Sequence, residues 1–269
     1  MSTWPDRPSL EGLSRVPAPE DSRFIASALR GSWGFDDLAR FDSDAVLQHL
    51  GIECRESNLG GGEGGPQGLL MPLADGGFRI EVDPSPPEGW RGAPTALREE
   101  VSRHRRRFTI AHELAHTLFY WRGGSAPERV AKDSAAQEIF CDALASALLV
   151  PPAAAEAMSL HPESVIALHR AYDVSIEVAA RALVHAHRES VGWVVICPPN
   201  AEEPWVQWGA ERSSDAVGPW RALLRIAERV KESDAVAQAR LRWRSGGTTL
   251  ARGLFLTERN QLVVIARAA

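Results

Sequence analysis

Two histidines and a glutamate in the stretch RRRFTIAHELAHTLFYW, residues 105–121, have the spacing of a metal site. His112 and His116 are four residues apart, so on an α-helix of ~3.6 residues per turn their imidazoles share one face. Two such imidazoles can hold a zinc ion at about 2.0–2.1 Å. Glu113 would lie beside that ion, where a carboxylate can take a proton from metal-bound water. The pattern predicts a metal site with Glu113 as the catalytic base.

The residues around this motif strengthen the prediction. A match as short as His-Glu-x-x-His arises by chance in roughly one or two chains per hundred of this size. Here the flanking residues are apolar and indicate a buried helix, whose histidines need polar partners. A metal ion would supply them. The apolar neighbours are Phe108, Ile110, Ala111, Leu114, Ala115 and Leu118.

A catalytic zinc site needs a third protein ligand and an open fourth position. Glu138 lies 22 residues after His116, in AAQEIFCDALASALLVP, where a second helix can return past the first. Asp142, four residues further on, shares a helix face with Glu138 and can accept the free ring N–H of a ligating histidine. We therefore expect Glu138 to complete the metal site and Asp142 to orient a histidine. Glu128 and Asp133 are rival carboxylates, but they lack the helical register. Zinc is the expected ion, and manganese or iron also suits such a ligand set.

Several motifs in this order resemble the ImmA/IrrE family of metallopeptidases. They are HELAH, then QEIFCDALASALLVP, then RAYDVSIEVAARAL. The lead-in at 107–111, the Leu-Leu-Val-Pro ending at Pro151, and the Val-Ser step before Arg181 also match that family. The resemblance covers roughly residues 70–185. Cys141 stands where the family more often has alanine, and we expect a small packed residue there.

The resemblance implies a fold similar to the thermolysin-like zincins, with His-Glu-x-x-His on one helix and Glu-x-x-x-Asp on the next. It implies a bacterial or phage protease whose partner is a protein substrate, a helix-turn-helix repressor, in stress response or mobile-element control. No direct nucleic-acid or membrane contact is expected. The residues themselves reach only metal-dependent hydrolysis. A non-catalytic, metal-stabilised regulator that binds a repressor or toxin partner stays open, as does a zinc amidase acting on a small substrate. Glu113 favours an enzyme, because a structural zinc needs no general base.

The elements that would position these residues indicate an α+β fold. GLLMPL and GFRIEVDP around an Asp-Gly turn predict a hairpin, part of a small antiparallel sheet beside a helical active-site core. In zincins the strand before the zinc helix pairs with extended substrate, so Arg79, Ile80 and Glu81 are the expected substrate-binding residues. Another short strand is expected over 52–57. Helices are expected over 96–121, 133–149, 162–171 and 175–188.

These elements suggest a loose arm over residues 1–20, a zincin-like metallopeptidase domain over 21–188 and a small α/β domain over 189–269. The last part contains five strand-like runs and an amphipathic helix pattern over 218–233. We expect its tryptophans to fill a small core, and its role to be sensing or partner binding.

The bulk composition excludes several classes of protein. Of 269 residues, 44% are hydrophobic and 24% charged, which is ordinary for a globular chain. A net charge of −5 provides no general attraction to nucleic acid or anionic membranes. No apolar run approaches the ~20 residues that span a bilayer, and the N-terminus lacks a secretion-signal pattern. Three scattered cysteines argue against a disulfide framework, so we expect a cytoplasmic protein.

Two further features are ambiguous. The basic run 103–107 fits a solvated helix start with salt bridges to Glu99 and Glu100, or an anchor for an acidic substrate segment. The glycine-rich stretch 58–68 is expected to be a flexible loop rather than a phosphate cradle, because no Lys-Ser/Thr follows it. An oxyanion donor should also exist, and the candidates are His169, Tyr172 and His185.

Overall fold

The computed structural model describes most of the chain, in five ranges of 20 or more residues and several shorter ones. These are residues 13–35, 38–60, 66–85, 94–121, 126–132, 134–187, 190–196, 205–209, 216–217, 223, 226, 237–243, 248–256, 259 and 261–267. The fold is α+β, as predicted. The chain divides into two compact units, Met1–Pro151 and Pro152–Ala269. The predicted domain boundary after residue 188 stays a prediction. None of the helices in the described ranges combines the length and apolar character that a bilayer crossing requires.

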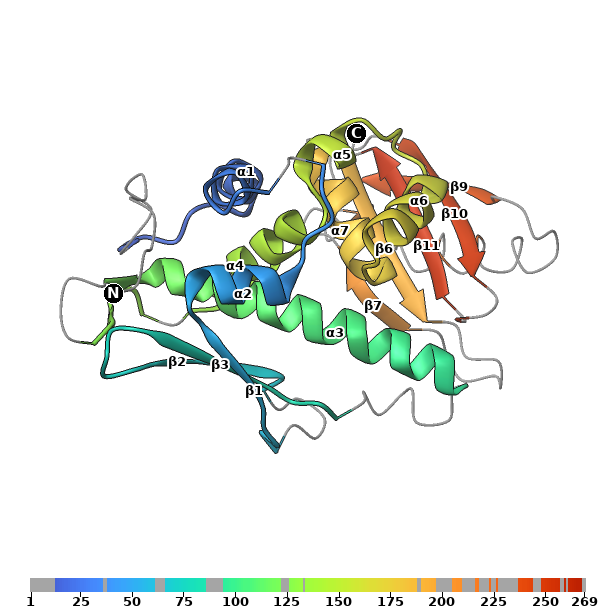
Figure 1. Ribbon diagram of the computed structural model, residues 1–269. Helices are drawn as coiled ribbons and strands as arrows, with labels where there is room; N and C mark the ends of the chain where they lie inside the picture. The colour runs from blue at the N-terminus through green and yellow to red at the C-terminus, as the bar shows by residue number, and fades with distance from the viewer. Residues whose placement is uncertain are drawn as a thin grey trace. The chain divides into compact units, whose positions relative to one another are not determined.

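The first unit contains four helices and two small sheets in its described part (Figure 1). The helices are α1 (Ser22–Ser32), α2 (Ser43–Leu50), α3 (Thr95–His116) and α4 (Ala135–Leu149). The strands are β1 (Glu53–Glu56), β2 (Gly68–Pro72), β3 (Phe78–Val82), β4 (Tyr120–Trp121) and β5 (Glu128–Arg129).

The three-stranded sheet has the order β1-β3-β2. The predicted hairpin is confirmed: β2 and β3 pair antiparallel, with Leu70 opposite Ile80, around a turn in which Gly76 has a φ of +87°. The expectation of an antiparallel sheet is wrong for β1, which pairs parallel to β3. The reason is topological, because the chain leaves β1 on one side of β3 and enters β2 on the other. Alternate residues of β3 are buried, namely Phe78, Ile80 and Val82.

Helix α3 ends earlier than its sequence pattern predicts. It stops at His116, and a short 3-10 turn, Thr117–Phe119, leads into β4. The Thr117 hydroxyl donates to the carbonyl of Leu114 at 2.6 Å, and such side-chain bonds compete with helical ones. Tyr120 and its neighbour then pair with β5. The predicted helix to residue 121 is therefore wrong over its last turn.

Helix α4 follows its prediction closely, because its end signals are local. The Ser134 side chain accepts a hydrogen bond from the N–H of Gln137 at 3.2 Å, which caps the first turn. The helix ends just before Pro151, in keeping with the restriction that proline places on a preceding residue. Phe140 is fully buried and meets the ring of Phe119 edge-on at 5.9 Å. This packing fixes α4 against the end of α3.

The second unit combines an antiparallel sheet with helices α5 (Pro152–Glu156), α6 (Pro162–Tyr172) and α7 (Ile176–Ala186). The six strands follow the order β7-β6-β11-β10-β9-β8, and each described pair is antiparallel. The α/β label predicted for residues 189–269 therefore needs correction, because the described strands in that range pair antiparallel, which is typical of an α+β arrangement. The strands are β6 (Ser190–Ile196), β7 (Trp205–Gly209), β8 (Ala216–Val217), β9 (Ala237–Trp243), β10 (Thr248–Leu256) and β11 (Gln261–Arg267).

The core of the second unit lies on both faces of its sheet. Six consecutive residues of β11, from Gln261, are buried, which is typical of a strand covered on both sides. Helices α6 and α7 contact β11 (Figure 1). Leu223 and Ile226 pack in a cluster with Trp193, which confirms a core role for that tryptophan. Apart from those two residues, the predicted helix over 218–233 lies outside the described residues.

Candidate metal centre

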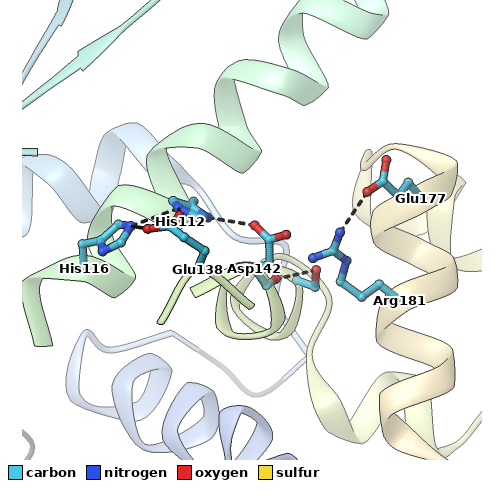
Figure 2. A network of polar contacts seen from close by, with 7 residues as sticks. His112, His116, Glu138, Asp142, Glu177 and Arg181 are labelled. Atoms are coloured by element: carbon cyan, nitrogen blue, oxygen red, sulfur yellow. Dashed lines mark hydrogen bonds and ion pairs between the residues drawn. The ribbon is translucent and has the colours of Figure 1, made fainter. Parts of the chain in front are cut away.

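The predicted ligands converge where α3 and α4 meet. His112 and His116 face each other with their Nε2 atoms 3.0 Å apart. Glu138 reaches both rings from α4: its Oε2 lies 3.1 Å from His112 Nε2, and its Oε1 lies 3.5 Å from His116 Nε2 (Figure 2). These three side chains form a group that could hold a metal ion.

The spacing of the ligand atoms is close to that around a tetrahedral zinc ion. Zinc bonds of about 2.0–2.1 Å place neighbouring ligand atoms ~3.3 Å apart. His112 Nε2 lies 3.0 Å from His116 Nε2 and 3.1 Å from Glu138 Oε2, and the other carboxylate oxygen, Oε1, lies 3.5 Å from His116 Nε2. Half of the Glu138 side chain, 54%, is exposed, so one side of the group is open to solvent. Two imidazoles, one carboxylate and an open side are the arrangement of catalytic rather than structural zinc sites.

Two carboxylates hold the His112 ring in place. Its Nδ1 donates to Asp142 Oδ1 at 2.9 Å, and its Nε2 faces Glu138 (Figure 2). Burial disfavours the charged ring, but the hydrogen bonds to Asp142 and Glu138 prevail and raise the pKa of His112 from 6.5 to about 9. The hydrogen bond between His112 and Glu138 also lowers the pKa of Glu138. A metal cation can replace the proton on His112 Nε2. The hydrogen bond to Asp142 keeps the other proton on His112 Nδ1 and orients the ring.

Glu113 occupies a buried position between α3 and β2. Only 7% of the residue is exposed. Burial raises the pKa of Glu113 to about 7, helped by the charge of Glu138 and opposed by His112 and by a hydrogen bond from the Leu70 backbone. A carboxylate whose pKa lies near neutrality is well suited to accept and return a proton.

Gly68 is a residue of the site that the sequence motifs did not reveal. A Cβ atom added there would lie 2.4 Å from Thr109 Cγ2 and 2.8 Å from Glu113 Oε1. Only glycine therefore lets β2 approach α3 this closely. The signal that could have found it is a glycine at the start of a strand, which often marks close backbone approach.

Strand β2 lies at an edge of the described three-stranded sheet, whereas β3 lies at its centre. In the described part of the chain β3 is paired on both sides, so it cannot accept a further strand. The expectation that Arg79, Ile80 and Glu81 pair with substrate is wrong for this reason. Arg79 instead lies 3.5 Å from Glu81 in an ion pair.

The pairing pattern also tells which atoms of β2 face outward. Asp83 N–H donates to the Gln67 carbonyl and Leu73 N–H to the Gly77 carbonyl, so odd-numbered residues of β2 bond to β3. The backbone groups of Gly68 and Leu70 therefore point away from β3. The hydrogen bond from Leu70 to Glu113 agrees with that direction.

Comparison with known proteins places much of this site in one family. Residues 96–184 match the family Peptidase_M78, described as the IrrE N-terminal-like domain. Residues 96–184 belong to this family. The IrrE-like segment includes all three candidate metal ligands, and it confirms the resemblance expected from the sequence. It runs past Pro151, where the two compact units divide.

Two further comparisons describe the whole chain. A solved structure described as a Mycobacterium tuberculosis transcriptional regulator aligns over 92% of this chain and 87% of that chain, with 12% identity and a TM-score of 0.48. No curated protein matches the sequence.

The rival carboxylates and the candidate oxyanion donors are not part of the ligand group. Glu128 is an exposed residue of β5, outside the ligand group, and Asp133 lies outside the described residues. His169 contacts the Val174 carbonyl through Nδ1 at the end of α6. Tyr172 and His185, on α6 and α7, also belong to the second unit, so no oxyanion donor is assigned.

Cys141 is a packed residue, as expected. It is fully buried on α4, and burial raises the pKa of its thiol well above the ordinary value. A thiol in this state is a poor nucleophile. The structure therefore gives Cys141 a place in the helix interface rather than in the chemistry of the site.

The basic run is tied to several different neighbours. Arg106 forms an ion pair with Asp44 of α2 at 3.1 Å, and Arg107 is buried and donates to the Phe41 carbonyl at 2.7 Å. His104 is buried and lies 3.8 Å from Glu100. Of the two acidic partners predicted for the run, Glu100 is the one that pairs with it in the described contacts. Most of the run thus fastens α3 to its surroundings.

Proposed function

We propose that this chain is a zinc-dependent endopeptidase that cuts an intracellular regulatory protein. The observation that carries the proposal is the group formed by His112, His116 and Glu138, with a buried Glu113 beside it. A purely structural site needs no such base. The family match to a peptidase domain supports the same reaction.

The chain's own residues would divide the work as follows. His112, His116 and Glu138 would hold zinc, which supplies Lewis acidity to acidify water and polarise a peptide carbonyl. Asp142 keeps the proton on His112 Nδ1, so that Nε2 faces the ion. Glu113 accepts a proton from the attacking water on its carboxylate and delivers it to the leaving amine. The Leu70 N–H positions that carboxylate.

Substrate would bind in an extended form along β2. The outward backbone groups of Gly68 and Leu70 border Glu113, so a peptide there lies next to the base. We propose a helix-turn-helix repressor as the substrate, on the strength of the sequence resemblance to ImmA/IrrE peptidases. The second unit would serve sensing or partner binding.

Proteolysis can be tested before the substrate is identified. Zinc-loaded wild type and Glu113→Gln would each be added to lysate of the source organism, and new protein N-termini would be sequenced. We expect new termini with the wild type alone, and the same zinc content in both proteins. Identical termini with both proteins would favour the alternative, a metal-stabilised regulator that binds a repressor or toxin without cutting it. Cleavage of small amides alone would favour an amidase.

A further inference from the structure

A charged pocket lies on α3 about two helical turns before the metal ligands. It has a volume of about 230 Å³ and is lined by the end of β3 and by one side of α3. Three arginines line it, Arg103, Arg105 and Arg106, together with Ser85 and Ser102. Glu56 and Asp83 also contribute to its wall. Neither the metal site nor the proposed proton transfer uses this pocket.

Arg105 differs from its neighbours in the partners that it has. Its Nε donates to Gln67 Oε1 at 2.8 Å, and its Nη1 donates to the Ser85 carbonyl at 2.7 Å. Both of these hydrogen-bond partners are neutral, whereas Arg106 bonds directly to the Asp44 carboxylate. Asp83 acts on Arg105 through its charge, but its Oδ1 also accepts the Ser85 N–H.

The Arg105 guanidinium is partly removed from water by the residues around it. Burial lowers the pKa of Arg105, and the charge of Asp83 only partly opposes that effect. A fixed, partly desolvated guanidinium binds a carboxylate more strongly than a flexible one in open water does. The pocket therefore presents a fixed guanidinium whose hydrogen-bond partners are neutral, which is the kind of group that a carboxylate binds.

Arg105 also lies in line with the proposed substrate strand. Gln67, its partner, immediately precedes β2, and Gly68 and Leu70 then border Glu113. Strand β2 thus runs from Arg105 towards the base. His112 comes seven positions after Arg105 in α3, which is a rise of ~10 Å at about 1.5 Å per residue. An extended peptide spans that distance with about three residues.

We propose that Arg105 and its pocket bind an acidic side chain of the substrate, about three residues to the carboxyl side of the cleaved bond. Antiparallel addition to β2 places the carboxyl half of the peptide at the Arg105 end. This inference rests on the proposed peptidase function, because it assigns the bound carboxylate to a peptide substrate. Binding of a carboxylate at Arg105 can be measured without any cleavage.

The first test is a titration of the zinc-loaded, ¹⁵N-labelled full chain followed by NMR. The Arg105 Nε–Hε signal is identified by its loss in Arg105→Lys. N-acetyl-glutamate amide should shift this signal at concentrations about tenfold lower than N-acetyl-glutamine amide, as expected for a charge-assisted hydrogen bond. Equal responses, or no response to either probe, would overturn the proposal. A tighter response to N-acetyl-glycine would also overturn it, because the site would then read a chain end.

The second test measures the sequence preference of cleavage on a defined peptide library. Wild type should favour Asp and Glu at the second to fourth positions after the cut. Arg105→Gln should lose that preference, while Arg98→Gln, on the same helix but outside the pocket lining, should retain it. An unchanged acidic preference in Arg105→Gln would refute the assignment. Absence of cleavage by every variant would count against the peptidase function, and the titration would still decide the pocket.

Discussion

Two stretches of helix α3 use their polar side chains in opposite ways. In the basic run, Arg105, Arg106 and Arg107 reach outward to separate partners on β-strand connections and on or before α2. In the metal motif that follows, His112 and His116 turn towards each other and share Glu138 from α4. One helix thus has a fastening end and a converging end.

This difference distinguishes polar side chains that hold a helix in place from those that form a candidate metal site. Contacts that diverge are nearly independent, so the loss of one leaves the others in place. Contacts that converge share partners, and each side chain changes the charge state of the next. The hydrogen bonds to Asp142 and then to Glu138 raise the pKa of His112, and the hydrogen bond from His112 lowers the pKa of Glu138. Perturbations of the two ends should therefore differ in size and in additivity.

Loss of a ligand at the converging end should have the largest effect. His116→Ala removes one of three ligands, so zinc affinity should fall by more than the ~10–100-fold that loss of an outer hydrogen-bond partner costs. Competition with a chromophoric chelator measures this affinity. His49→Ala, on an exposed position of α2, is the matched control and should bind zinc like the wild type. Wild-type affinity in His116→Ala would break the comparison.

Loss of the orienting carboxylate should have a smaller effect of the same kind. Asp142→Asn removes the charge that holds the His112 Nδ1 proton, and zinc affinity should fall ~10–100-fold. Asp44→Asn removes the carboxylate on α2 that pairs with Arg106 of the fastening end, and it should leave zinc affinity unchanged. Equal losses in the two variants would show that the two ends are not distinct.

The close approach of β2 to the converging end can be tested through stability. Gly68→Ala forces a methyl group against Thr109 and Glu113, so the free energy of unfolding should fall by ~1–3 kcal/mol. Gly31→Ala is the control, since no atom lies within 4 Å of the added methyl group in helix α1, and there alanine should stabilise by ~0.5–1 kcal/mol. Urea unfolding measures both values. A neutral Gly68→Ala would mean that β2 can move away freely.

The converging end should make stability depend on pH. In the metal-free protein His112 has a folded pKa of about 9 against an ordinary 6.5, so its contribution to stability is complete below 6.5 and is lost as pH rises through 9. The raised pKa of Glu113, about 7, acts in the same direction, because its neutral form is the one favoured by folding. The melting temperature after chelation should therefore fall from pH 6.5 to 9. His112→Ala should flatten this profile, and an identical slope would contradict the account.

The smallest effect is expected at the fastening end. Arg106 and Asp44 form an ion pair whose side chains are 35% and 69% exposed, so solvent screens it strongly. Arg106→Gln should lower the free energy of unfolding by no more than ~1 kcal/mol, and less at high salt. A double-mutant cycle with Asp44→Asn measures the coupling. A coupling above ~2 kcal/mol would mean that this end, too, works as a unit.

The parts of the fold that the sequence predicts well depend on local signals. The β2–β3 hairpin follows from an Asp-Gly turn, and the end of α4 follows from Pro151. The convergence of His112, His116 and Glu138 follows from helical spacing and a short return. In each case the deciding residues are close in the chain or lie on facing helices.

The parts that the sequence does not predict depend on which strand lies beside which. A one-dimensional pattern does not show that β1 joins β3 in parallel and leaves β2 at the edge. For that reason the sequence pattern points to Arg79–Glu81 as the substrate strand and gives no sign of the role of Gly68. The early end of α3 has the same origin, because β4 forms only with a partner, β5, from beyond the turn.

Locating the metal ion would show whether His112, His116 and Glu138 are its ligands. Crystals of the zinc-loaded protein would be measured on both sides of the zinc absorption edge. We expect one anomalous peak at about 2.0–2.1 Å from Nε2 of His112, Nε2 of His116 and a carboxylate oxygen of Glu138. A peak elsewhere, or no peak within bonding distance of these three side chains, would contradict this assignment.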